Sequence, residues 1–349
     1  MRKRHYLALL LGAILAPRAW TAEFFIAPGG DDSQAGTKDK PFATLEHARD
    51  AARRSVGATV YLRGGTYLLD KSLILTPEDS GVTFQAYPGE TPILSGGRAI
   101  SGWRPMAGSA SIWCASIPKG WRFHYLFVNG KRAQRSRLIN NDHWRQWPKD
   151  HQPGSPAKEG QLVTFTKNQA ALAGLPSNGD VEMVCIMAQY GVMGNGVLTD
   201  INPAAGTARW NSAQINLRGS RTPTERGYNL ENALKFIDEP GEWAVDSASG
   251  MVYYWPRVGE DLTKAEVIAP RLYELIRLQG VEETGPWVRN VTLRGLTLMY
   301  TDRLAENEWP HGWLKRMWEN VDATLYVQGA QDCVFEEIAC STTAPTALR

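Results

Sequence analysis

An internal repeat close to the end of the chain is the feature that most constrains its fold. Residues 290–298 align with residues 332–340 at a constant offset of 42, and the strand before each copy also matches. Within each copy the apolar residues alternate, slip by one position at a bend and alternate again, which predicts two short strands with the same side facing inward. The matching apolar positions are Val291 with Cys333, Leu293 with Phe335, Leu296 with Ile338, and Leu298 with Cys340. Such units bury a core by stacking like on like along an axis, which is typical of a parallel β-helix.

Residues 23–100 show the same pattern of short predicted strands. Short β-rich runs are separated by Gly, Pro and charged turns, which predicts strands at 24–26, 59–62, 64–69, 72–75, 82–87 and 93–95. One helix is expected over 44–55, with Thr44 as its N-cap and with Leu45, Ala48, Ala51 and Ala52 on one face. Because the ends of a solenoid expose apolar surface and strand edges, we expect this helix to cover the amino-terminal end of the β-helix.

Residues 101–270 break the pattern. They are rich in tryptophan, and the runs 242–246 and 250–255 predict a β-hairpin. We therefore expect an inserted antiparallel β domain with a sandwich or barrel-like core. The predicted fold class is all-β, a right-handed parallel β-helix with this insertion. The predicted order is a leader at 1–22, the β-helix start at 23–100, the insertion at 101–270 and further coils at 271–349.

The first 22 residues have the pattern of an export signal. Basic residues within 1–5 precede an apolar run at 6–16, which is too short to span a bilayer. We expect cleavage after Ala22 and an exported protein, with an uncleaved anchor as the alternative; beyond export, no membrane partner is expected. The chain carries 38 basic and 36 acidic residues, a formal net charge of +2. This balance argues against a nucleic-acid-binding protein, which would show a basic stripe.

Several segments resemble known carbohydrate-active proteins. Residues 25–32 (FIAPGGDD) and 40–45 (KPFATL) are similar to the opening of many secreted right-handed β-helix proteins, both polysaccharide lyases and glycoside hydrolases. Residues 126–137, 228–243 and 250–256 resemble the insertion domain of glycoside hydrolase family 141. The resemblance covers essentially all of residues 23–349. It implies hydrolysis of a glycosidic bond in a polysaccharide by a pair of carboxyl groups.

The resemblance assigns no catalytic residue to this chain. In such enzymes the catalytic acids are expected on later β-helix coils, beyond Arg349, and nothing after Cys340 predicts a cap. We therefore expect the chain to be the amino-terminal part of a glycosidase and to be inactive by itself. Two alternatives stay open. One is a polysaccharide lyase on the same fold, with a basic residue as proton abstractor and often calcium; the other is a non-catalytic glycan-binding or structural β-helix.

The candidate substrate-binding residues lie in the segment 302–322, which interrupts the coil repeat. Tryptophan faces there could stack on sugar rings while interleaved carboxylates bond hydroxyl groups. The alternative is a solvated loop whose tryptophans pack on the insertion. The candidate residues are Glu306, Glu308, Trp309, His311, Trp313, Trp318 and Asp322.

Three arginines, Arg132, Arg135 and Arg137, are expected to alternate on one strand. They could bind an acidic sugar, but pairing with acidic residues of the insertion is the favoured interpretation. Asp31 and Asp32 only weakly suggest calcium, which needs six to eight oxygen ligands. We expect no metal site and no cofactor.

Cysteine and histidine spacing carries little further chemistry. Cys333 and Cys340 occupy inward positions of the repeat, which favours buried thiols over a disulfide. The spacings of His124, His143 and His151 match no metal site and no catalytic triad. We expect these histidines to be surface or hydrogen-bonded residues.

Overall fold

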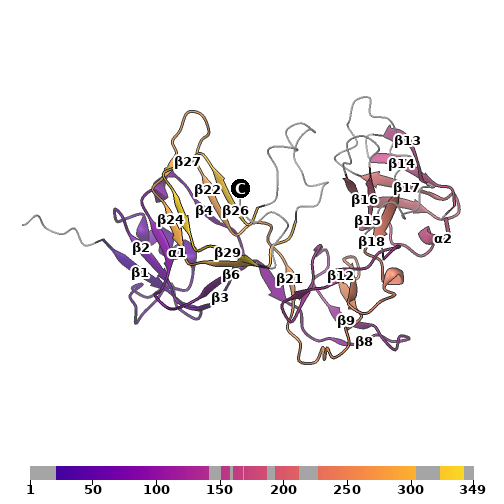
Figure 1. The fold of residues 1–349 in the computed structure, drawn as a ribbon, viewed down its shortest axis with the longest axis horizontal. Coiled ribbons are helices and arrows are strands. Elements are labelled where there is room, and N and C mark those ends of the chain that lie inside the picture. The colour runs from indigo at the N-terminus through magenta and orange to yellow at the C-terminus, as the bar shows by residue number, and fades with distance from the viewer. Residues whose placement is uncertain are drawn as a thin grey trace, which may run out of the picture.

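Parallel strands from the amino-terminal part of the chain, followed by strands from its carboxyl-terminal part, stack in successive coils (Figure 1). The computed structural model describes residues 21–140, 151–157, 160–167, 169–186, 193–211, 227–303 and 323–341. The largest parallel sheet runs β1 (Glu23–Ile26), β2 (Thr59–Leu62), β5 (Thr83–Ala86), β24 (Thr292–Arg294) and β28 (Val334–Glu336). A second sheet runs β3 (Gly65–Leu68), β6 (Pro92–Ser95), β25 (Thr297–Met299) and β29 (Ala339–Ser341). A third runs β4 (Leu73–Leu75), β22 (Ile276–Gln279) and β26 (Leu325–Gln328), and β23 (Val288–Arg289) pairs with β27 (Ala330–Gln331).

The register of these strands confirms the repeat. Leu293 pairs with Phe335 and Leu298 with Cys340, both at the predicted offset of 42. In the strand before, Ile276 pairs with Leu325, an offset of 49. The turn that follows Gly280 is longer in the earlier coil and takes up the difference. The chain is therefore a parallel β-helix, as the alternation of apolar residues predicted.

The inward side chains of the coils form one hydrophobic core. Val60, Phe84 and Leu293 stack on the largest sheet and are fully buried. Helix α1 (Leu45–Ala52) closes this core at its amino-terminal end, since Leu45, Ala48 and Ala52 are buried in the same cluster. The Thr44 hydroxyl accepts a hydrogen bond from the His47 backbone N–H, as expected of an N-cap.

Helix α1 ends three residues before the predicted boundary. Arg53 Nε donates to the buried carboxylate of Asp79 at 2.6 Å, which fastens the end of the helix to the 3-10 helix η1 (Pro77–Asp79). The chain then turns at Gly57, whose φ of +70° lies in the left-handed region that glycine adopts most easily.

The insertion leaves the β-helix after β6 and returns at β22. Its smallest sheet joins β7 (Gly97–Ala99), β10 (Phe127–Val128), β11 (Lys131–Arg132) and β21 (Val267–Pro270). The next joins β8 (Arg104–Pro105), β9 (Trp113–Ser116), β12 (Gln134–Arg135), β19 (Glu242–Asp246) and β20 (Met251–Tyr254). The predicted hairpin is β19 and β20.

A six-stranded sheet completes the insertion, flanked by α2 (Gln169–Leu172) and the 3-10 helix η4 (Leu234–Phe236). Its strands are β13 (His151–Ala157), β14 (Gly160–Phe165), β15 (Asn178–Ile186), β16 (Met193–Asn202), β17 (Thr207–Asn211) and β18 (Tyr228–Glu231). The strand pairs within the insertion are antiparallel, except that β12 runs parallel to β19.

The insertion contains two hydrophobic clusters rather than one continuous core. One includes Phe123, Trp243 and Tyr254, and the other includes Trp210 and Tyr228. The tryptophan excess that marked this region in the sequence thus fills two separate interiors. Strand β12 pairs with β19 beside the first cluster, and Arg137 after β12 pairs with Glu231 of β18 beside the second.

The insertion and the segment 304–322 follow equivalent strands of the β-helix in the sequence. Both connect the sheet that contains β6 and β25 with the sheet that contains β4, β22 and β26. At the corner between these two sheets, Tyr300 packs edge-on against Phe127 of the insertion, with ring centroids 5.2 Å apart. The coils and the insertion therefore share a packed junction at β25, beside which Asp302 and Arg303 emerge.

Two further predictions concern single features. Cys114, Cys333 and Cys340 are free thiols, and the last two pack half-buried against the β-helix core. This confirms inward thiols over a disulfide. Within the described part of the chain, no helix has both the length and the apolar character needed to cross a bilayer.

Candidate functional site

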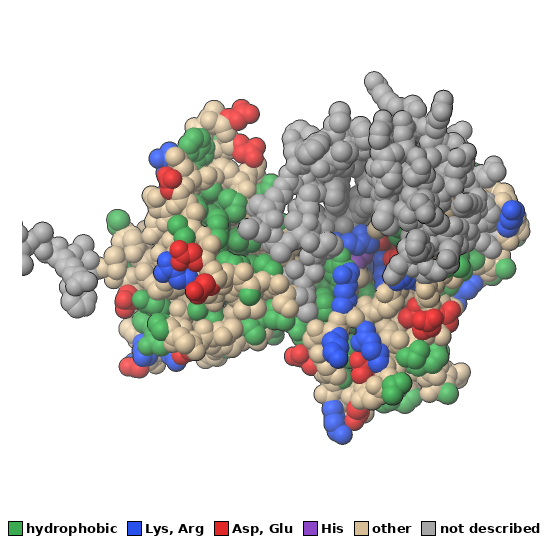
Figure 2. Space-filling model, viewed as in Figure 1, with side chains coloured by type: hydrophobic (Ala, Val, Ile, Leu, Met, Phe, Trp, Pro, Cys, Tyr) green, Lys and Arg blue, Asp and Glu red, His purple; other side chains and the backbone are tan. Residues whose placement is uncertain are grey.

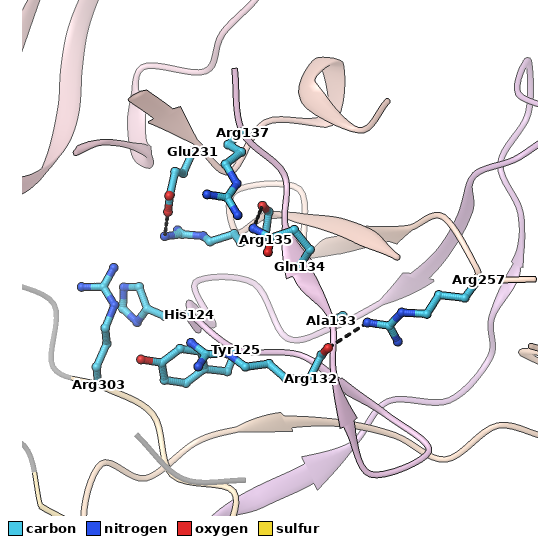
Figure 3. Close-up of a pocket in the computed structure, with 10 residues that line it drawn as sticks. All are labelled: His124, Tyr125, Arg132, Ala133, Gln134, Arg135, Arg137, Glu231, Arg257 and Arg303. Atoms are coloured by element: carbon cyan, nitrogen blue, oxygen red, sulfur yellow. Dashed lines mark hydrogen bonds and ion pairs between the residues drawn. The ribbon is translucent and has the colours of Figure 1, made fainter. Parts of the chain in front are cut away.

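A pocket of about 500 Å³ lies where the insertion meets the β-helix corner. Five arginines and one glutamate supply its charged side chains, together with a histidine (Figure 3). On the face seen in Figure 2, blue Lys and Arg side chains gather around a purple histidine. The lining residues are His124, Tyr125, Arg132, Ala133, Gln134, Arg135, Arg137, Glu231, Arg257 and Arg303.

A tight turn brings one wall of the pocket into place. Asn129 and Gly130 have φ values of +50° and +71°, as a two-residue hairpin turn requires, and they connect β10 to β11. Arg132 is the last residue of β11, and Arg135 is the last residue of β12. Buried Ala133 lies between the two strands. The three alternating arginines of the sequence therefore do not share one strand, yet all three line the same pocket.

The outer arginines are held by contacts within the insertion. The Arg132 guanidinium lies over the ring of Tyr125, 3.8 Å from its centroid. Arg257 Nη2 donates to the backbone oxygen of Arg132 at 2.8 Å, and its Nη1 lies 3.2 Å from Glu260 Oε1. Stacking and hydrogen bonding thus orient both guanidinium groups before any ligand arrives.

A buried charge cluster holds three of the lining residues, His124, Arg135 and Arg303, in place. Glu182 on β15 is 4% exposed and accepts from Arg135 Nη2 at 2.7 Å and from Arg303 Nη2 at 2.6 Å. His124 Nε2 lies 3.1 Å from Glu182 Oε1, and its Nδ1 lies 3.2 Å from Asp302 Oδ1. The cluster therefore fastens the β-helix residues Asp302 and Arg303 to the insertion.

The cluster shifts the pKa values of its members. Burial disfavours the charged form of His124, but the carboxylates of Glu182 and Asp302 outweigh it and raise the pKa of the imidazole. Burial also opposes ionisation of Glu182, yet Arg135, Arg303 and His124 hold the pKa of that carboxyl well below its usual range. Both ring nitrogens of His124 face carboxylate oxygens, which suits the imidazolium because it donates from both.

Glu231 differs from Glu182 although the two are direct partners across β15 and β18. Its Oε2 lies 3.8 Å from Arg135 Nη1, a looser contact than the hydrogen bonds of Glu182. Burial raises the pKa of Glu231; the nearby arginines oppose that shift, while the negative charge of Glu182 adds to it. The side chain of Glu231 is 20% exposed, so this carboxyl group faces the pocket and can carry a proton to a higher pH than an ordinary glutamate.

This arrangement suits anion binding better than a complete acid/base pair. Glycoside hydrolysis needs two carboxyl groups that flank the scissile bond. Glu231 is available as a proton carrier, but Glu182 is sequestered by two arginines and a histidine. Among the described lining residues, the abundant chemistry is that of guanidinium donors, which bind carboxylate and other oxyanions.

The structure leaves the main sequence candidates untested. Glu306, Glu308, Trp309, His311, Trp313, Trp318 and Asp322 lie outside the described residues. The segment that carries them begins directly after Arg303, a lining residue of the pocket. Their assignment to substrate binding stays a prediction.

Other candidates have structural partners. Asp32 accepts from the backbone N–H groups of Ala43 and Thr44 and so fastens the turn before α1. Asp31 accepts a hydrogen bond from the backbone N–H of Ser33 at 2.8 Å. No cluster of His, Cys, Asp and Glu that could hold a metal ion occurs among the residues that the structure describes.

The arginine prediction was right about one pairing and incomplete about the rest. Arg135 does pair with acidic residues of the insertion, Glu182 and Glu231. The guanidinium of Arg132, by contrast, makes no ion pair with the described residues and rests on an aromatic ring. His124 is hydrogen-bonded, as expected, but within a buried charge cluster that no spacing in the sequence signalled.

Comparisons with known proteins point to carbohydrate chemistry. No protein-family model matches the chain. A solved structure described as a glycoside hydrolase superposes with a TM-score of 0.74 and 25% identity, covering 94% of this chain and 63% of its own. The chain is an all-β protein of the β-helix class. It is similar to carbohydrate-active proteins.

Two curated proteins match shorter stretches. Pectate lyase PEL9 of Emericella nidulans is 28% identical over 150 residues, which is 38% of this chain and 34% of the relative. The uncharacterized protein YwoF of Bacillus subtilis is 40% identical over 74 residues, or 21% of this chain and 15% of the relative. The chain thus spans about a third of the first relative and less than two thirds of the similar solved structure.

Proposed function

We propose that this protein is an exported glycoside hydrolase that acts on a polysaccharide by carboxylate acid/base chemistry, of the kind found in glycoside hydrolase family 141. The observation that carries the proposal is the similarity to a glycoside hydrolase along 94% of the chain, insertion included. The polar pocket at the corner between coils and insertion is the place where the glycan would bind. In that position Glu231 is the described carboxyl group best suited to hold a proton near the substrate.

A polysaccharide lyase is the second candidate. Its support is the local similarity to pectate lyase PEL9 and the abundance of guanidinium groups in the pocket. Elimination removes a proton from the carbon next to a sugar carboxylate, and cations that neutralise this carboxylate make that proton more acidic. A lyase would use the arginines in this way and needs a base in addition.

One assay separates these reactions. The protein as its gene encodes it is incubated with a panel of neutral and acidic polysaccharides, and new reducing ends are measured together with ultraviolet absorbance. Hydrolysis releases reducing ends without an unsaturated product, whereas elimination also produces an absorbing unsaturated uronide. Reducing ends without absorbance support the hydrolase, absorbance that grows with them overturns it in favour of the lyase, and glycan binding without either product leaves a binding protein.

Export rests on the leader pattern of residues 1–22. Expression with the native amino terminus followed by mass determination of the protein recovered outside the cytoplasm tests it. A mature chain that begins at Glu23 is the expected result.

A further inference from the structure

Arginines outnumber carboxyl groups among the residues that line the pocket. Arg132, Arg135, Arg137, Arg257 and Arg303 all line it, against the single carboxyl group of Glu231. These arginines come from three separate stretches of the chain, around β11 and β12, after β20 and after β25. Their convergence is therefore a product of the fold and not of a local charged run.

Arg132 presents N–H donors that no other described residue accepts from. Its guanidinium is fixed against the Tyr125 ring, and within the described residues it makes no hydrogen bond and no ion pair. A guanidinium carries five N–H donors in a planar fork. Because stacking leaves the edge of that fork open, Arg132 is oriented to receive two oxygens of one ligand group.

Arg135 presents unused donors from a buried position. Its side chain is 10% exposed, and Nη2 bonds Glu182 at 2.7 Å. Among the described residues its Nε and Nη1 find no hydrogen-bond acceptor, and Nη1 only approaches Glu231 at 3.8 Å. Buried donors without acceptors are costly and rare, so the site is built for an acceptor that a ligand can supply.

The pocket offers little to a neutral sugar. Apart from the His124 imidazole, Tyr125 has the only aromatic ring among the described lining residues, and it is 4% exposed with Arg132 over its face. A sugar ring therefore finds no open aromatic platform in the described wall. The volume of the pocket, about 500 Å³, lies within the range of small-ligand sites.

We propose that this pocket binds the carboxylate of an acidic sugar, so that the polysaccharide on which the protein acts contains uronate residues. The inference deepens the proposed function and rests on it. Arg132 provides the accessible bidentate contact, and Arg135 provides the buried donors behind it. The raised pKa of Glu231 lowers its repulsion of an anion as the pH falls, because the protonated form is neutral.

The experiment measures binding by isothermal titration calorimetry at low ionic strength. The probes are trigalacturonate, its fully methyl-esterified form and a sulfated neutral trisaccharide. The variant is Arg132→Gln, which removes an exposed guanidinium and keeps the backbone oxygen that Arg257 bonds. The matched control is Lys131→Gln, an exposed neighbour on the same strand that loses the same charge but does not line the pocket.

The expected result is binding of trigalacturonate that weakens with added salt and is lost on esterification. Arg132→Gln lowers the affinity at least about tenfold, Arg132→Lys lowers it less, and Lys131→Gln leaves it nearly unchanged. Equal binding of the ester, or equal losses in Arg132→Gln and Lys131→Gln, overturns the proposal. Binding of the sulfated probe without trigalacturonate overturns the carboxylate assignment in favour of a sulfate ester.

The outcome is separable from that of the proposed function. A protein that hydrolyses a neutral polysaccharide and binds no uronate keeps the hydrolase and loses this inference. A protein that binds trigalacturonate through Arg132 and cleaves no polysaccharide keeps this inference as a binding property and loses the hydrolase.

Discussion

At the scale of single residues, Glu182 is the group on which the site depends. It is nearly fully buried, and Arg135, Arg303 and His124 surround its two oxygens. Its charge is tolerated in the interior only because these partners compensate it, and their charges are tolerated for the same reason. Removing one member of the cluster therefore leaves the other charges in the protein interior with less compensation.

Glu182→Gln should lower the free energy of unfolding by about 3–5 kcal/mol at pH 7, since it removes the buried carboxylate to which both Arg135 and Arg303 donate hydrogen bonds. The pKa of Glu182 is depressed in the folded state, so its stabilising contribution is present above the usual glutamate range and is lost as the pH falls through the folded pKa. The difference between wild type and variant should therefore shrink in acid. Urea unfolding followed by circular dichroism measures it.

Asp200→Asn is the control for that experiment. Asp200 is 69% exposed and pairs with Arg209 at 2.9 Å, so the same chemical change should cost less than about 1 kcal/mol. Equal losses of unfolding free energy in the two variants would show that burial does not make the Glu182 cluster contribute more to stability than an exposed ion pair.

At the scale of elements, the stacking of coils depends on turns that approach closely. The turn after β22 lies on the turn after β26, and a Cβ atom added to Gly280 would stand 2.1 Å from the backbone oxygen of Gly329. Backbone atoms in stacked coils have no room to retreat, because the sheet hydrogen bonds on either side fix their spacing. The stacking of these two turns therefore requires glycine at position 280.

Gly280→Ala should lower the stability of the β-helix by about 3 kcal/mol, because the added methyl group overpacks the stacked turns. Gly259→Ala separates this effect from backbone strain. Gly259 has a φ of +85° and no atom within 4 Å of an added Cβ, so its substitution should cost only about 1 kcal/mol. Thermal unfolding of both variants provides the comparison, and a Gly280→Ala protein as stable as wild type would contradict the close approach.

The pairing of strands explains why the β-helix could be predicted from the sequence more completely than the insertion. Strand periodicity and the 42-residue repeat locate β24, β25, β28 and β29, because each strand pairs with an equivalent strand at a fixed offset. In the insertion, strands pair with non-equivalent partners, and β12 even runs parallel to β19. Sequence alternation predicted the β19–β20 hairpin but contained no sign that two separate hydrophobic clusters would form.

At the scale of the whole molecule, His124 joins the insertion to the coils. Its backbone N–H donates to both carboxylate oxygens of Asp302 at 3.1 and 3.2 Å, and its ring lies between Asp302 and Glu182. The raised pKa of His124 ties this junction to pH. Asp302 and Glu182 favour the imidazolium, and Arg303 opposes it.

His124→Gln should lower the free energy of unfolding by about 3 kcal/mol at pH 6 and by less at a pH above the folded pKa of the imidazole. A raised folded pKa means that the stabilising contribution is complete below the ordinary histidine value of about 6.5 and is lost as the pH rises through the folded value. Melting temperatures of wild type and variant across this range measure it. His47→Gln, an exposed histidine on α1, is the control and should change little at either pH.

The sequence by itself determined the parallel β-helix, its cap helix, the register of its coils and the inward direction of Cys333 and Cys340. These features follow from periodicity, which each short segment carries locally and which stacking repeats. The sequence also drew attention to Arg132, Arg135 and Arg137, and it favoured pairing with acidic residues of the insertion over binding of an acidic sugar.

Only the tertiary structure decided where chemistry gathers. His124, Glu182, Glu231 and Arg303 are separated by tens of residues and follow no shared spacing. They meet because the insertion leaves and re-enters the β-helix at one corner, where β25 packs against β10 and β21. Burial and neighbouring charge then set two glutamates on adjacent strands to opposite pKa shifts, and such shifts depend on surroundings that exist only in the folded chain.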